Sequence, residues 1–119
     1  MTICITSTDQ SLDAPINPSF GRAPYFLFVD PETETAQTVK NTPGAHGAGV
    51  QAAQIVASNK ATVVITGNVG PNAYQGLSAA NIEIYVGAKG SGRDALDDYN
   101  AGRLSLAQGP TGAPHGGRR

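Results

Sequence analysis

The sequence has 119 residues, which fits one domain and is long enough to bury a core without disulfides or structural metals. Its hydrophobic content of 39% excludes a disordered protein, no apolar run approaches the ~20 residues of a membrane helix, and the first segment lacks the pattern of a signal peptide. The formal net charge of −1 argues against a nucleic-acid-binding module, so we expect a cytoplasmic protein without nucleic-acid or membrane partners.

The first half of the chain predicts three strands. Residues 2–7 are rich in β-branched residues and predict the first strand, which a loop with three prolines, residues 8–24, separates from the second. Residues 25–30 read Tyr-Phe-Leu-Phe-Val-Asp and predict the second strand, and residues 33–40 alternate well enough to form its partner. The short turn between these two strands implies an antiparallel hairpin, after which residues 41–49 form a loop with three glycines.

The second half alternates helical and strand-like segments, as in parallel crossovers. The continuous apolarity of residues 61–66 indicates a strand buried on both faces, and Ser91 to Asp94 has the spacing of a capping box. The expected elements are a helix at 50–59, a strand at 61–66, a helix at 72–80, a strand at 82–86 and a helix from 91 to about 100. Residues 103–108 are either a short edge strand or coil, and residues 109–119 are expected to be a flexible Gly/Pro tail.

Two glycine-bearing loops at strand ends are the strongest candidates for a binding surface. The loop Thr66–Pro71 follows a buried strand and precedes a helix, where ligands bind in open α/β sheets and where glycines and unpaired N–H groups can approach an anion. The loop Ser19–Arg22 carries the only basic residue of the first 39 positions, and a guanidinium can clamp an anion. A tight turn without ligand and an arginine that only shapes its own loop remain the alternatives.

Candidates for metal ligation and catalysis are few. His46 lies in the glycine-rich loop and could ligate one exposed position of a preformed cluster, although a solvated or capping histidine is the alternative. Cys4, the single cysteine, is expected to be a buried apolar residue of the first strand, and His115 is expected to be incidental. The sequence has no G-x-S-x-G, C-x-x-C or H-E-x-x-H motif, so we expect no enzymatic activity.

Three segments together resemble the dinitrogenase iron–molybdenum cofactor biosynthesis family. Residues 20–26 resemble its FGRAPYF signature, residues 46–49 its HGAG helix start, and residues 67–73 its GxxGPNA turn, within a match of roughly residues 1–105. For residues 1–108 the resemblance implies a ribonuclease-H-like three-layer α/β fold, in which a five-stranded mixed sheet with an N-terminal antiparallel hairpin carries helices on both faces. It does not imply nuclease activity, because residues 2–7 contain no acidic residue to hold a metal.

The resemblance also implies a function. It suggests a non-catalytic binding or carrier protein for an iron- and/or molybdenum-containing sulfur cluster or its precursor, with an acceptor or cluster-assembly protein as a partner. The cofactor-binding residues that it nominates by motif position are Phe20, Gly21, Arg22, Gly67, Asn68, Val69 and Gly70, and the metal ligand is His46. A small domain that binds or senses an anionic metabolite, and a protein–protein adaptor that uses its Gly/Pro tail for docking, are the alternatives.

Overall fold

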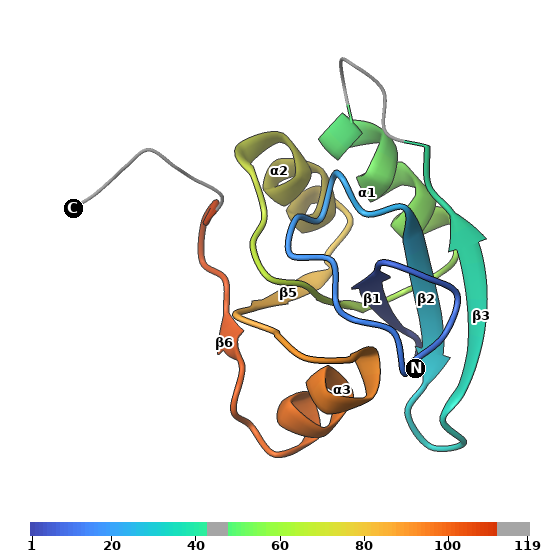
Figure 1. Ribbon diagram of the computed structural model, residues 1–119. Helices are drawn as coiled ribbons and strands as arrows, with labels where there is room; N and C mark the ends of the chain where they lie inside the picture. The colour runs from blue at the N-terminus through green and yellow to red at the C-terminus, as the bar shows by residue number, and fades with distance from the viewer. Residues whose placement is uncertain (43–47, 112–119) are drawn as a thin grey trace.

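The structure is a computed structural model that describes residues 1–42 and 48–111 (Figure 1). One six-stranded mixed sheet has the strand order β3-β2-β1-β4-β5-β6. The strands are β1 (Ile3–Ser7), β2 (Tyr25–Asp30), β3 (Thr35–Lys40), β4 (Val63–Ile65), β5 (Glu83–Val86) and β6 (Ser105–Leu106). The helices are α1 (Ala48–Ser58), α2 (Pro71–Ala79) and α3 (Gly92–Asn100).

The sheet is antiparallel on one side and parallel at its centre. The β2–β3 hairpin pairs antiparallel, as the sequence predicts, and β2 also pairs antiparallel with β1. Strand β1 is parallel to β4, with Ile3 opposite Val63, and β4 is parallel to β5. The crossovers after β3 and β4 run through α1 and α2, so the carboxyl ends of β1, β4 and β5 lie at one edge of the sheet.

The expected count of five strands is wrong, because a sixth strand is present. Strand β6 has only two residues, both exposed, and it pairs antiparallel with β5. Its position is fixed by backbone hydrogen bonds, such as that from the Ala107 N–H to the Ile84 carbonyl at 2.8 Å. So short a segment has no burial pattern, which is why the sequence left it undecided between strand and coil. The assignment to the ribonuclease-H-like group stays a prediction.

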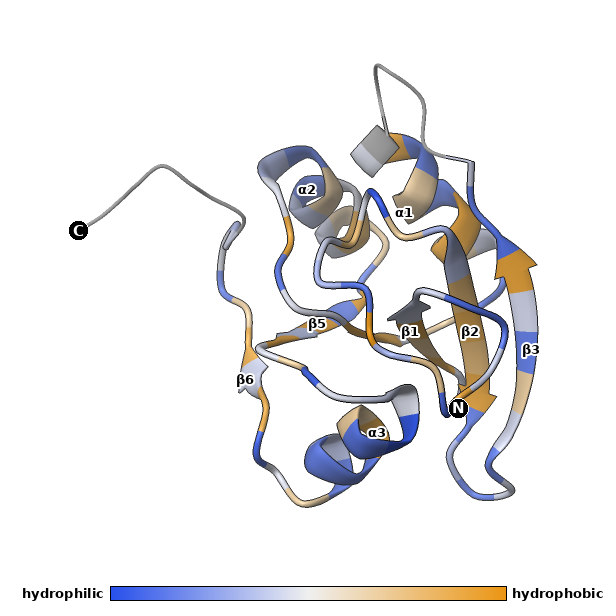
Figure 2. Ribbon diagram, viewed as in Figure 1, coloured by the Kyte–Doolittle hydropathy of each residue, from blue (hydrophilic) through white to orange (hydrophobic). Residues whose placement is uncertain are grey.

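Helices cover both faces of the sheet, as expected. Alternate strand residues, among them Cys4 and Phe26, face α1 and α2 in one core cluster. Their neighbours, among them Ile5 and Leu27, face α3 in a second cluster. Every residue of β1 is buried, because β1 is central and covered on both sides. Figure 2 shows the contrast between the hydrophobic β2 and the largely hydrophilic α3, which lays its few apolar residues on the sheet.

The helix starts follow local sequence signals. Pro71 occupies the first turn of α2, where its missing N–H costs nothing. The capping box predicted at Ser91 forms, with Asp94 in the place of the usual glutamate. No helix within residues 1–42 and 48–111 combines the length and the apolarity that crossing a bilayer requires.

Candidate binding site

The two loops predicted as a binding surface lie against one another. One follows β1 and the other follows β4, which is its parallel neighbour (Figure 1). Ser19 and Asn68 form a parallel bridge, in which the Asn68 N–H donates to the Pro18 carbonyl at 2.8 Å and the Phe20 N–H donates to the Asn68 carbonyl at 3.2 Å. The two loops are therefore joined by their backbones.

Side-chain hydrogen bonds that the sequence did not predict also support this junction. Thr6 Oγ1, at the end of β1, is hydrogen-bonded to the Asn17 carbonyl oxygen at 2.8 Å and to Thr66 Oγ1 at 2.9 Å. The Asn17 side chain in turn donates to the Ser19 carbonyl at 2.8 Å. Thr6 and Thr66 are fully buried, so the bond between them is shielded from water, and together these bonds fix the loops to the central strands.

The two glycines of the second loop have different roles. A Cβ on Gly67 would lie 2.6 Å from the Pro18 carbonyl oxygen and 2.8 Å from its Cα, so the contact between the loops requires glycine there. Gly70 has an ordinary φ of −78°, and a Cβ built on it meets nothing within 4 Å. The fold thus gives no reason for glycine at position 70, where a side chain would project into open space.

Gly70 also lines a small pocket of about 200 Å³. It is lined by Ser19, Gly21, Arg22, Gly49, Gly70, Pro71, Asn72 and Ala73. The structure therefore brings Gly21 and Arg22 of the first loop together with Gly70 of the second, as the sequence predicts. Gly49, Asn72 and Ala73 were not predicted, because they become part of the site only through the packing of two helices.

Two helix N-termini converge on this pocket. Gly49 lies in the first turn of α1, and its Cβ position is 3.1 Å from the Ala73 nitrogen, so the two helices approach closely there. Helix α2 has Gly70 as its N-cap and no side-chain cap. The first-turn amides of Asn72 and Ala73 have no acceptor within the helix, and the positive ends of both helix dipoles favour an anion.

The charge that the described residues bring to the pocket is positive. Arg22 is exposed and is the one charged residue among the described residues that line the pocket. With two helix N-termini beside it, the pocket is electropositive in a chain whose formal net charge is −1. The arrangement can therefore select a small anion.

Four nominated residues do not line the pocket: Phe20, Gly67, Asn68 and Val69. Phe20 is buried and stacked on Phe26, with ring centroids 5.4 Å apart, and Val69 is fully buried. Their positions hold the loops in place, and direct contact between these residues and a guest stays a prediction.

The metal-ligand candidates are poorly placed or outside the structure. His46 and His115 lie outside the described residues. Cys4 is fully buried, as expected, and this burial raises the pKa of its thiol far above the usual range, so the thiolate that binds metals does not form. Within the described residues, no group of three or more His, Cys, Asp or Glu side chains is placed to hold a metal ion.

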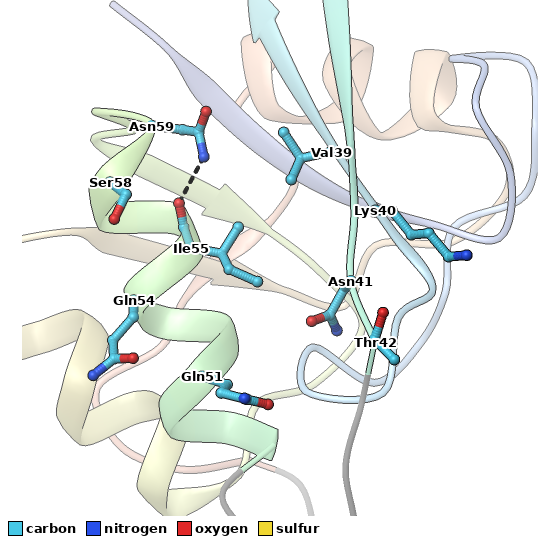
Figure 3. A pocket seen from close by; sticks show the side chains of 9 residues that line it. All are labelled: Val39, Lys40, Asn41, Thr42, Gln51, Gln54, Ile55, Ser58 and Asn59. Carbon is cyan, nitrogen blue, oxygen red and sulfur yellow. Dashed lines mark hydrogen bonds between the residues drawn. The ribbon is translucent and has the colours of Figure 1, made fainter.

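A larger hollow of about 510 Å³ lies between β3 and α1, and no residue of the two predicted loops lines it (Figure 3). It is lined by Val39, Lys40, Asn41, Thr42, Gln51, Gln54, Ile55, Ser58 and Asn59. Its lining is mostly neutral amides and hydroxyls, and the hydrogen bond drawn there, from Asn59 Nδ2 to the Ile55 carbonyl at 2.8 Å, closes the end of α1. Lys40 is the one charged residue of this lining, but the hollow lies beside the carboxyl end of α1, whereas two helix N-termini face the smaller pocket. We therefore place the candidate site in the smaller pocket.

Comparisons with known proteins agree with the resemblance seen in the sequence. Residues 1–102 match the family model described as dinitrogenase iron-molybdenum cofactor. The apo form of the orange protein from Desulfovibrio gigas superposes with a TM-score of 0.89 at 38% identity, covering 93% of this chain and 96% of the other. A Thermotoga protein provisionally named as NifB superposes with a TM-score of 0.81 at 32% identity, covering 93% and 98%.

The chain is also similar in sequence to an archaeal protein. The uncharacterized protein MJ0580 of Methanocaldococcus jannaschii is 28% identical over 94 residues, which is 75% of this chain and 80% of the relative.

Proposed function

Because the chain belongs to the dinitrogenase iron-molybdenum cofactor family, we propose that it is a non-catalytic carrier of an iron- and/or molybdenum-containing sulfur cluster or of its precursor. The observation that carries the proposal is the electropositive pocket at the junction of the two loops. A role in cofactor biosynthesis is also consistent with the likeness to the NifB-named protein, and with a structural neighbour described as an apo form, that is, without its bound group.

The mode of capture follows from which donors are present. Iron–sulfur clusters are ordinarily held by cysteine thiolates, and the one cysteine of this chain is inaccessible. The pocket instead offers the backbone N–H groups of α2 and the guanidinium of Arg22, which donate hydrogen bonds and carry positive charge. Terminal sulfides of an anionic cluster would accept those hydrogen bonds. Release to an acceptor or cluster-assembly protein then requires no metal–thiolate bond to break.

The size of the pocket disfavours an organic metabolite as the guest. Sites for drug-sized organic ligands occupy about 300–1,000 Å³. The described lining encloses about 200 Å³, which suits a compact inorganic anion better than a nucleotide. A free phosphate is also compact, so the experiment must separate the two anions.

Tetrathiomolybdate is a suitable probe, because it is a small molybdenum–sulfur anion. The protein is purified anaerobically and incubated with tetrathiomolybdate or, at equal ionic strength, with phosphate. We expect the amide signals of Gly70, Asn72 and Ala73 to shift with tetrathiomolybdate, and molybdenum to remain with the protein after desalting. Shifts with phosphate alone would support the metabolite-binding alternative. No shift and no retained molybdenum would reject the carrier proposal.

A further inference from the structure

The chain beyond α3 does not end at the sheet edge but returns to the candidate site. Strand β6 pairs with β5, and the Ala107 N–H donates to the Ile84 carbonyl at 2.8 Å. Four residues later, Thr111 lies against Val69 in the loop that precedes α2. The segment 105–111, which we name the strap, therefore joins the edge of the sheet to the second loop of the site (Figure 1).

Thr111 holds both polar groups of Val69. The Thr111 N–H donates to the Val69 carbonyl at 2.7 Å, and the Val69 N–H donates to Thr111 Oγ1 at 2.9 Å. Among the described residues, Thr111 is the one hydrogen-bond partner of the Val69 backbone. The bond from the Val69 N–H requires a hydroxyl acceptor at position 111, because a side chain without oxygen would leave that N–H unpaired.

The strap completes the fixation of the loop. Asn68, on one side of Val69, is bonded through its backbone to Pro18 and Phe20. Gly70, on the other side, lines the pocket. Thr111 does not line the pocket, but both of its hydrogen bonds are to the residue next to Gly70.

We propose that Thr111 is a positioning residue, and that the strap holds the Gly67–Gly70 loop in the conformation that binds the anion. This inference rests on the proposed function for the identity of the guest. Its structural part concerns the Val69 amide and can be tested without any guest. The binding-competent arrangement is one of several that an unfixed loop would sample, so loss of the strap lowers the apparent affinity by the fraction of time that the loop is misplaced.

The test uses the full chain with Thr111→Val, which removes the hydroxyl, and Thr111→Ser, which keeps it. Thr38→Val is the matched control, because it makes the same change at a half-buried position of the edge strand β3. Hydrogen exchange of the Val69 amide measures the strap, and titration with tetrathiomolybdate measures the site. A chain that ends at Thr111 keeps the strap, whereas a chain that ends at Gly109 loses it.

Thr111→Val should accelerate Val69 exchange by about fivefold or more and weaken tetrathiomolybdate binding by roughly three- to tenfold, the factors that one ordinary hydrogen bond accounts for. Thr111→Ser should keep the exchange rate of the Val69 amide and the tetrathiomolybdate affinity close to those of the wild-type protein. Thr38→Val should change neither the exchange rate nor the affinity. The chain ending at Thr111 should keep Val69 protected, and the chain ending at Gly109 should not.

Unchanged Val69 exchange in Thr111→Val would overturn the strap, whatever the guest. Faster exchange with undiminished tetrathiomolybdate binding would overturn the positioning role. If the wild-type protein binds no tetrathiomolybdate, the proposed function fails, and the exchange data alone decide whether the strap exists.

Discussion

One added methyl group should have opposite consequences at Gly67 and at Gly70. In Gly67→Ala the new Cβ would lie 2.6 Å from the Pro18 carbonyl oxygen, so the two loops must separate. Separation loses the hydrogen bonds from Asn68 to Pro18 and from Phe20 to Asn68, each contributing ~0.5–1.5 kcal/mol. With ~1–3 kcal/mol for the crowded backbone, the free energy of unfolding should fall by about 2–6 kcal/mol.

In Gly70→Ala the added Cβ meets no atom within 4 Å, and the φ of −78° is allowed for alanine. The reduced entropy of the unfolded chain favours alanine by ~0.4–1 kcal/mol, and the N-cap preference for glycine opposes it. The free energy of unfolding should therefore stay within about 0.5 kcal/mol of wild type. Gly70 lines the pocket, however, so a methyl group added there should narrow the pocket and weaken tetrathiomolybdate binding by about tenfold or more.

Thermal unfolding and tetrathiomolybdate titration of both variants provide the measurement. For a chain of this size about 1 kcal/mol corresponds to about 4 °C in Tm, so Gly67→Ala should lower Tm by roughly 8–24 °C and Gly70→Ala by less than about 2 °C. If Gly67→Ala had the Tm of the wild-type protein, the loops would not be in contact as described. Wild-type affinity in Gly70→Ala would show that the guest does not enter this pocket.

Other substitutions test the charges and ligands of the site. Arg22→Gln should weaken tetrathiomolybdate binding by roughly tenfold and reduce its dependence on salt, as titrations at two ionic strengths would reveal; an unaltered salt dependence would argue against an electrostatic role. His46→Ala distinguishes two modes of capture, since lower molybdenum retention after desalting would indicate imidazole ligation, and unchanged retention would leave hydrogen bonds and charge alone. Burial raises the pKa of the Cys4 thiol above its ordinary value of 9.0, so deprotonation of the unfolded chain lowers stability by about 1.4 kcal/mol per pH unit above pH 9. Chemical denaturation at pH 8 and pH 10 should show that Cys4→Ala loses this component, and an identical pH dependence in both proteins would contradict the buried thiol.

The strands and helices could be predicted where burial leaves a pattern. The apolar run of residues 25–30 and the short turn after it predicted the β2–β3 hairpin, which the structure confirms. The exposed strand β6 could not be predicted, because its position depends on backbone bonds to a distant strand.

Some residues of the candidate site could likewise be predicted from the local sequence, and others could not. Arg22 and Gly70 could be nominated from their local setting, at strand ends beside helix starts. The need for glycine at position 67 could not, since it arises from an approach to Pro18 across 49 residues of chain. Gly49 ends the HGAG segment, but its place in the pocket depends on the packing of α1 against α2. Thr111 contacts Val69 through the strap, and nothing in its local sequence indicates that contact.

The bridge between the two loops has a consequence for how such a pocket can diversify. The loops are joined by main-chain bonds, and these do not depend on the side chains of Ser19 and Asn68 that form the bridge. Ser19, Arg22 and Asn72 line the pocket, and the two main-chain bonds of the junction involve none of their side chains. Replacing them would change the charge and the shape offered to a guest while the frame stays in place. One scaffold can therefore be adapted to different inorganic anions by exchanging a few side chains at its rim.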